Sequence, residues 1–233
     1  MYLFYLPEAE LGLCKLSEEE SFHGTRVLRL KAGEQISLTN GEGCFFKAHV
    51  VQPDSKACMV DVFERIEQSD RTKEHLHIAV SPLKNPARLE WFLEKAVEIG
   101  IDEITLIVCE HTEKSREKTD RLQRLLISAM KQSLRSKLPK LNGLVKFNDF
   151  MKQTSDAAKL IAWCGEGEKT LLKDALKPNE NSIILIGPEG DFSETEVKMA
   201  FEKGYKAISL GDSRLRTETA ALVACHTVCL INQ

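Results

Sequence analysis

Two short segments near the C-terminal end carry residues that could bind a ligand. The first, IGPEGDFS (186–193), follows the apolar run SIILI, and the second, LGDSRLRTETAAL (210–222), follows the shorter run AIS. Gly187 and Gly190 remove side chains where a ligand would approach backbone amides, and Pro188 stiffens the loop between them. The pattern predicts a pocket lined mainly by backbone groups.

The second segment adds charged side chains at the start of a helix, where free backbone amides favour acceptor atoms of a ligand. Arg216 and Glu218 stand there, ahead of a run of small residues. They could face a ligand, or they could form an ion pair with no part in chemistry. Glu189 and Asp191 of the first segment leave the same choice, because they could face a positively charged ligand or simply cap the loop and pair with arginine.

The phosphate-binding patterns of nucleotide enzymes are absent from the sequence. No G-x-G-x-x-G follows a predicted strand. The stretch GEGEKT (165–170) lacks the upstream glycine of a P-loop and has Glu168 before Lys169. An NTPase or an NAD-dependent enzyme is therefore disfavoured, and a ligand with little phosphate fits the acidic loop better.

Strands that alternate with helices must position these segments. Three predicted strands (159–164, 182–186 and 207–210) each end in a glycine-containing loop. The alternation is typical of a doubly wound parallel sheet covered on both faces, whose ligands sit outside the carboxyl ends of the strands. Further strands are expected at 75–83 and 104–110. Helices are expected at 86–100, at 117–137 before Pro139, shortly after Gly167, at 193–204 behind a Ser193–Glu196 capping box, and at 217–232.

The first 68 residues have a different character, with short strand-like runs and turn signals. Asn40-Gly41 is a strong hairpin signal between VLRLKAGEQISLT and CFFKAHVV, and KACMVDVFERI adds a further strand. This region predicts a small β-barrel or sandwich. The polar stretch 68–74 is the expected linker, so we expect one domain at 1–70 and a second at 74–233.

Composition excludes several classes of protein. The chain has 233 residues, is 42% hydrophobic and carries a net charge of −3. Its seven cysteines contain no C-x-x-C pair and its six histidines show no metal-ligand spacing, which predicts reduced thiols, no metal and a cytoplasmic location. The N-terminus lacks the basic region of a signal peptide, and no apolar run is long enough to span a membrane.

Positive charge gathers in one stretch. Residues 114–140 hold nine Lys or Arg and two acids, so the stretch carries +7 and the remainder −10. A basic helix on an acidic protein indicates an anionic partner such as RNA, although a solvated surface helix would show the same pattern.

The two C-terminal segments together resemble the signatures of the RsmE family, which are SPOUT-class methyltransferases that use S-adenosylmethionine to modify N3 of a uridine in bacterial 16S ribosomal RNA. The similarity extends to HGTRVLRLKAGEQISLTNG, to SPLKNPARLEWFLEKAVEIGIDEI, and to ISAMKQSLRSKLPKL with its Gln132-Ser133 pair. The chain departs from the family pattern at Lys131, Asp191 and Ser213.

The resemblance implies a fold and a set of roles. It implies an α/β SPOUT domain with a C-terminal trefoil knot, a small N-terminal PUA-like β-barrel, and a homodimer. The implied catalytic residues are Arg216, which would stabilise charge on the base, and Glu218, which would orient Arg216 or complement the cofactor; no general base is obvious. The implied cofactor-binding residues are Trp163, Cys164, Leu185, Gly187, Pro188, Glu189, Gly190, Leu210, Gly211, Leu215, Arg216 and Thr219. The expected contacts with RNA are Arg26, Arg29, Lys84, Arg121, Arg124, Arg135 and Lys137. A SPOUT enzyme for another rRNA or tRNA site, or a non-catalytic RNA-binding assembly factor, is the open alternative.

Overall fold

The computed structural model describes residues 2–67, 74–114 and 116–233, and the chain divides into two compact units. The first comprises Met1–Asp70 together with Ile127–Leu138, and the second comprises Arg71–Leu126 together with Pro139–Gln233. Apart from Glu74, the expected linker at 68–74 lies outside the described residues. The domain boundaries 1–70 and 74–233 stay a prediction, and the structure adds that part of the basic stretch packs with the N-terminal unit.

The N-terminal unit is built on a five-stranded sheet with the strand order β1-β3-β4-β5-β2. Its strands are β1 (Leu3–Tyr5), β2 (Gly12–Lys15), β3 (Gln35–Thr39), β4 (Cys44–Gln52) and β5 (Met59–Glu67). Strand β1 runs parallel to β3, and the other pairs are antiparallel. The expected hairpin around Asn40-Gly41 is confirmed, because the carboxamide oxygen of Asn40 accepts hydrogen bonds from the amides of Glu42 and Cys44 before β4 begins.

One part of the N-terminal prediction is wrong. The run VLRL, expected to be strand-like, closes a helical segment formed by α1 (Glu18–Phe22) and the π-helix η1 (His23–Val27). The hydroxyl of Ser17 caps α1 by accepting from the amide of Glu20. After η1 the chain turns at Arg29, whose φ is 59°, and the amide of Leu30 donates to the carbonyl of Gly24. The alternating residues of VLRL therefore form a turn and not a strand.

Segment 127–138 belongs to the N-terminal unit through specific contacts. The amide of Leu138 donates to the carbonyl of Gly41 (2.8 Å), and the hydroxyl of Thr39 donates to the carbonyl of Ser136 (3.0 Å). The ammonium of Lys131 lies 2.5 Å from the carboxylate of the buried Glu20. Lys131, one of the departures from the family pattern, therefore has a structural partner.

The C-terminal unit contains a seven-stranded parallel sheet with the order β10-β12-β9-β11-β6-β7-β8. The strands are β6 (Leu76–Val80), β7 (Glu103–Val108), β8 (Lys140–Lys146), β9 (Ala158–Ala162), β10 (Thr170–Leu171), β11 (Ser182–Ile186) and β12 (Lys206–Ser209). The predicted parallel sheet is confirmed. The edge strands β8 and β10 were not expected from the sequence, because neither has a continuous apolar run.

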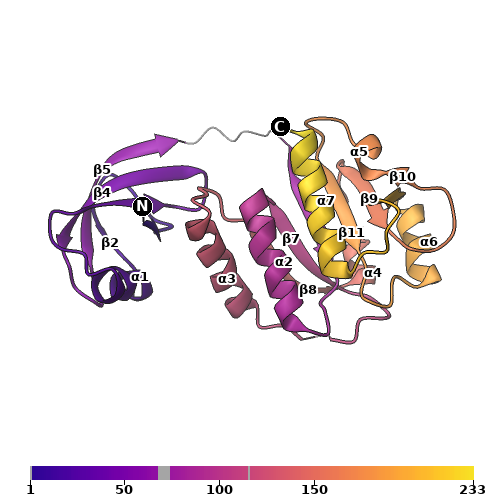
Figure 1. Cartoon of the computed structure of the whole chain (residues 1–233), viewed down its shortest axis with the longest axis horizontal. Coiled ribbons are helices and arrows are strands. Elements are labelled where there is room, and N and C mark those ends of the chain that lie inside the picture. The colour runs from indigo at the N-terminus through magenta and orange to yellow at the C-terminus, as the bar shows by residue number, and fades with distance from the viewer. Residues whose placement is uncertain (1, 68–73, 115) are drawn as a thin grey trace. The chain divides into compact units, whose positions relative to one another are not determined.

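Helices cover both faces of this sheet. They are α2 (Pro86–Ile99), α4 (Phe147–Phe150), α5 (Leu172–Ala175), α6 (Glu194–Glu202) and α7 (Thr217–Ile231), whereas α3 (Thr119–Gln132) begins in the C-terminal unit and ends within segment 127–138 of the N-terminal unit. Helices α2 and α7 lie side by side across one face (Figure 1), and side chains of α4 and α6 pack in a cluster on the other. Helix α3 ends at Gln132, earlier than the predicted 137, because the chain leaves the helix through Leu134 at a φ of 53°.

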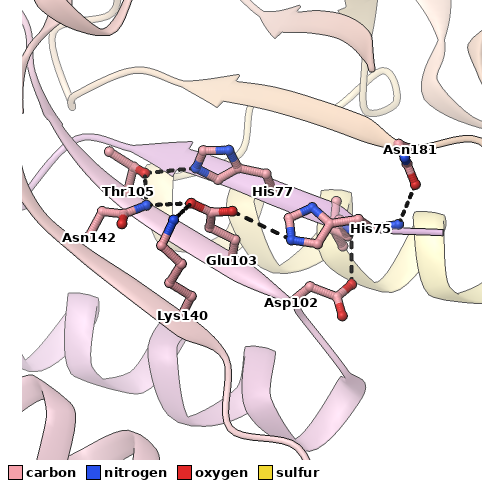
Figure 2. A network of polar contacts seen from close by, with 9 residues as sticks. His75, His77, Asp102, Glu103, Thr105, Lys140, Asn142 and Asn181 are labelled. Carbon is pink, nitrogen blue, oxygen red and sulfur yellow. Dashed lines mark hydrogen bonds and ion pairs between the residues drawn. The ribbon is translucent and has the colours of Figure 1, made fainter. Parts of the chain in front are cut away.

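A polar network ties together the amino ends of β6, β7 and β8 (Figure 2). Nε2 of His77 lies 2.7 Å from the hydroxyl oxygen of Thr105, which also accepts from the side chain of Asn142 at 2.8 Å. The carboxylate of Glu103 accepts hydrogen bonds from the ammonium of Lys140 at 2.9 Å and from the side-chain amide of Asn142 at 2.6 Å. Burial lowers the pKa of His77 to about 4. A polar cavity of about 460 Å³ borders the network.

Three further observations concern chemistry and location. Within the described ranges no helix is long and apolar enough to cross a membrane. The same ranges contain no group of three or more His, Cys, Asp or Glu side chains that could hold a metal ion. All seven cysteines are free thiols.

Candidate active site

The three glycine-containing loops lie next to one another at one edge of the sheet. Strands β12, β9 and β11 are consecutive neighbours and run parallel, so the loops that follow them share the carboxyl edge. The sequence predicted each loop separately, and the strand order brings them together. This edge is where open α/β sheets bind ligands.

Asp191 fastens the loop after β11 to the loop after β9. Its carboxylate accepts hydrogen bonds from the amide of Cys164 (2.9 Å) and from the amide of Phe192 (2.8 Å). Its own amide donates to the carbonyl of Pro188, and its φ of 64° lies in the left-handed region that aspartate tolerates. Asp191 stands where the family pattern often has glycine. It adopts a backbone conformation that glycine adopts readily, and its carboxylate accepts two hydrogen bonds that glycine could not.

The two glycines of this loop are required by close packing. A Cβ atom at Gly187 would lie 3.0 Å from the ring of the buried Phe192, and one at Gly190 would lie 3.0 Å from Cβ of His111. We expected these glycines to leave room for a ligand. The structure shows that they also leave room for neighbouring side chains of the protein.

The loop after β9 is shaped around Trp163. The Trp163 ring meets Phe201 of α6 edge-on at 6.3 Å, and the ammonium of Lys169 lies 5.4 Å from its centroid. A Cβ atom at Gly165 would lie 2.0 Å from the indole. Cys164, the residue beside it, is exposed. The pKa of its thiol is nevertheless raised, mainly because the thiol is partly desolvated and also because of the negative charge of Asp191.

The loop after β12 leads into α7. The hydroxyl of Ser209 bonds to both the amide and the carbonyl of Gly211, which holds a φ of +124°. The positive charge of Arg214 in this loop opposes the rise in the pKa of the Cys164 thiol. Leu210 and Leu215 are half-buried in the same loop.

Arg216 and Glu218 have different surroundings. Arg216 is exposed at the residue that precedes α7, whereas Glu218 is buried, with only 7% of its surface exposed. Oε1 of Glu218 lies 3.7 Å from Nε of Arg88 on α2, and its Oε2 has no hydrogen-bond partner among the described residues. The ion-pair alternative therefore applies to Glu218 with Arg88, a residue that the sequence analysis did not single out.

The loops after β6 and β7 lie at the same edge and contact the loop after β11. The amide of Ser81, just after β6, donates to the carbonyl of Ile186 at 3.0 Å. The amide of Lys84 donates to the carboxylate of Glu189 at 3.2 Å. The ammonium of Lys84 pairs with Glu113 at 2.8 Å, and this bond raises the pKa of the lysine. The contact with Lys84 helps to hold Glu189 within the turn, and the ammonium of Lys84 is already paired within the protein.

After Arg88, His111 is the second residue at the site that was not expected from the sequence, and it lies in the loop after β7. Its Nδ1 lies 3.1 Å from the carbonyl oxygen of Gly190 and 3.0 Å from that of Asp191, while its ring is exposed. No histidine was expected at the site, because none lies in the three glycine loops. Only the strand order, which is a long-range property, brings residue 111 to residue 190.

The residues expected to contact RNA are spread over both units. Arg26 and Arg29 are exposed in the N-terminal unit, which also holds the half-buried Arg135. Arg121 and Arg124 are exposed on α3 in the C-terminal unit. Arg121 pairs with Glu90 at 3.0 Å, so its charge is partly compensated within the protein.

Comparison with known proteins identifies the family. A model described as the RNA methyltransferase domain matches residues 70–229, and one described as the RNA methyltransferase PUA domain matches residues 16–63. The chain belongs to the RNA methyltransferase family. The expected RsmE type is confirmed by the curated relatives, which carry the name ribosomal RNA small subunit methyltransferase E. One of these, from Mesomycoplasma hyopneumoniae (strain 232), is 29% identical over 95% of this chain and 96% of the relative.

Solved structures of rRNA methyltransferases share the fold along the whole chain. A crystal structure of a probable rRNA-methyltransferase from Porphyromonas gingivalis superposes with a TM-score of 0.92 at 41% identity, covering 100% of this chain and 98% of that one. A ribosomal RNA small subunit methyltransferase E from Neisseria gonorrhoeae, bound to S-adenosyl methionine, superposes with a TM-score of 0.87 at 28% identity, covering 97% and 95%. The α/β domain with its parallel sheet and the PUA-like N-terminal domain match these structures.

Proposed function

We propose that this protein uses S-adenosylmethionine to methylate N3 of a uridine in the RNA of the small ribosomal subunit. The observation that carries the proposal is the joining of three backbone-rich glycine loops at the carboxyl edge of β9, β11 and β12, in a chain of the RNA methyltransferase family. The two-domain similarity to RsmE-type proteins along the whole chain supports the substrate class. A ribosomal substrate supports the proposal of a cytoplasmic location.

The acidic side chains of the loops suit the positive charge of the cofactor. S-adenosylmethionine supplies an electrophilic methyl group on a positively charged sulfonium. Backbone groups of the three loops would hold its adenine and ribose. The residues that we propose for this role are Trp163, Cys164, Leu185, Gly187, Pro188, Glu189, Gly190, Leu210, Gly211, Leu215, Arg216 and Thr219. Glu218 fits the sulfonium because it is a buried carboxylate whose Oε2 has no partner among the described residues, while its Oε1 pairs with Arg88.

Arg216 would act on the substrate. Uracil must give up the N3 proton before N3 can accept a methyl group, and the base then carries negative charge. An exposed guanidinium at the start of α7 can stabilise that charge or position the base. Arg26, Arg29, Arg121, Arg124 and Arg135 would contact phosphates, which gives affinity and register but no sequence specificity.

We further propose that the C-terminal segment forms a trefoil knot and that the protein is a homodimer, as the resemblance implies. The resemblance carries this proposal; in the structure β11 lies between β9 and β6, and α7 packs against α2. Light scattering after gel filtration would measure the mass, and a monomer would refute the dimer.

Calorimetry with S-adenosylmethionine separates the enzyme from a non-catalytic RNA-binding factor. The enzyme is expected to bind one cofactor per chain, and the Glu218→Gln variant, which keeps the shape of the side chain, is expected to bind more weakly. If the wild-type protein takes up no cofactor at millimolar concentration, the enzymatic proposal fails.

A further inference from the structure

The proposed reaction needs a group that accepts the N3 proton, and the three glycine loops contain no histidine. Arg216 is cationic and cannot accept a proton at neutral pH. The carboxylate of Glu189 is held by the amide of Lys84, and Glu218 is buried beside Arg88. Histidine is the side chain that most often transfers protons in enzymes, which points to an imidazole from another element at the same edge of the sheet.

His111 is placed and oriented for this task. Its Nδ1 contacts two atoms, the carbonyl oxygens of Gly190 and Asp191, at 3.1 and 3.0 Å. Carbonyl oxygens only accept hydrogen bonds, so Nδ1 must carry the proton and donate. In the neutral ring, Nε2 is then the nitrogen with the free lone pair. Because the ring is exposed, this lone pair is accessible to a substrate.

The contact also fixes the ring to the loop that is proposed to hold the cofactor. Cβ of His111 lies against Gly190, where even one added carbon would approach within 3.0 Å. The next residue, Thr112, anchors the same segment, because its hydroxyl oxygen accepts from the amide of Cys109 at 2.8 Å and bonds to the hydroxyl of Ser81 at 2.8 Å. A base must hold a defined position relative to the reacting atoms, and these contacts supply it.

The other five histidines lie elsewhere. Two belong to the N-terminal unit, two lie at the amino edge of the sheet in the network of Figure 2, and one is the tenth residue of helix α7. In that order they are His23, His49, His75, His77 and His226. Among the described residues, His111 is the histidine at the carboxyl edge of the sheet.

We propose that His111 is the general base of the reaction, an inference that rests on the proposed function. Nε2 takes the proton from N3 of the uracil, and the electron pair of the N–H bond stays on N3, where it forms the bond to the incoming methyl group. The sulfur keeps the electron pair of the bond that breaks, so it becomes a neutral thioether. The imidazolium of His111 then returns its proton to water, and no oxidant or further reactant is needed.

Two substitutions separate a base from a loop anchor. His111→Asn keeps an N–H donor near the position of Nδ1 and removes Nε2, whereas His111→Ala removes both. Single-turnover methyl transfer to isolated small ribosomal subunits should slow by about 10²- to 10⁴-fold in the Asn variant. Its affinity for S-adenosylmethionine, measured by calorimetry, should equal that of the wild type. The Ala variant should lose rate and also bind the cofactor more weakly.

The contrary outcomes are distinct. If the Asn variant transfers methyl groups as fast as the wild type while the Ala variant is slow, His111 only anchors the loop and the inference is overturned. Nitrogen NMR of labelled histidine gives a readout independent of turnover, and it should report Nδ1 of His111 protonated in the neutral ring. Protonation on Nε2 instead would overturn the inference. If the wild type methylates no subunit while these NMR signals are as expected, the proposed function itself fails.

Discussion

The buried histidine of the amino-edge network makes acid stability of the C-terminal unit a sharp test of the structure. His77 is only 6% exposed, and burial lowers its pKa to about 4 from the ordinary value of 6.5. The folded protein therefore holds His77 neutral where the unfolded chain would protonate it. Stability is fully present above the unfolded pKa of 6.5 and is lost as the pH falls towards 4.

The magnitude follows from the two pKa values. Their difference, at about 1.4 kcal/mol per pK unit, corresponds to roughly 3 kcal/mol of unfolding free energy between pH 7 and pH 4. The variant His77→Gln keeps a polar group near Thr105 and removes the titration. Its unfolding free energy should fall with acid by roughly 3 kcal/mol less than that of the wild type.

Tryptophan fluorescence during urea unfolding is the assay, because Trp91 and Trp163 both lie in the C-terminal unit. Measurements at pH 7, 5.5 and 4 compare the wild type with the variant. His226→Gln, at an exposed histidine on α7, controls for the loss of an imidazole as such. Parallel pH profiles for the wild type and His77→Gln would refute the claim that burial holds His77 neutral.

Three further predictions concern the site and its supports. Gly190→Val should abolish binding of S-adenosylmethionine in calorimetry and leave the circular dichroism spectrum unchanged, since the added side chain meets His111 and displaces the loop; retained binding would mean that the loop holds no cofactor. Ser193→Ala should lower the unfolding free energy by about 1 kcal/mol, because its hydroxyl caps α6 in a complete capping box, and an unchanged midpoint in thermal unfolding would contradict that role. Arg124→Glu should weaken RNA binding and make its salt dependence shallower by about one in log–log slope, whereas an unchanged slope would remove Arg124 from the phosphate contacts.

Local signals predicted much of the C-terminal unit. Helix α2 follows an Asn85 cap and a proline at its first position, and it ends at Gly100, whose φ is 125°. The capping box set the start of α6, and strand β11 coincides with the predicted range 182–186. These elements were predictable because caps, glycine conformation and apolar runs act over a few residues.

Long-range pairing explains what could not be predicted. The sequence does not state that β7 lies two strands from β11, so the contact of His111 with Gly190 was not foreseen. The partnership of Glu218 with Arg88 depends in the same way on the packing of α7 against α2. The run VLRL misled because alternation of Leu28 and Leu30 fits a strand as well as a turn after a helix.

The central claim is methylation of a uridine in small-subunit RNA, and methyl transfer tests it most directly. Small ribosomal subunits from cells that lack the enzyme would be incubated with the protein and S-adenosylmethionine carrying a labelled methyl group, and the modified nucleotide would be mapped by mass spectrometry. We predict one methyl group per subunit, on N3 of a single uridine. Label on another base or another RNA, or none at all from a protein that binds the cofactor, would contradict the account.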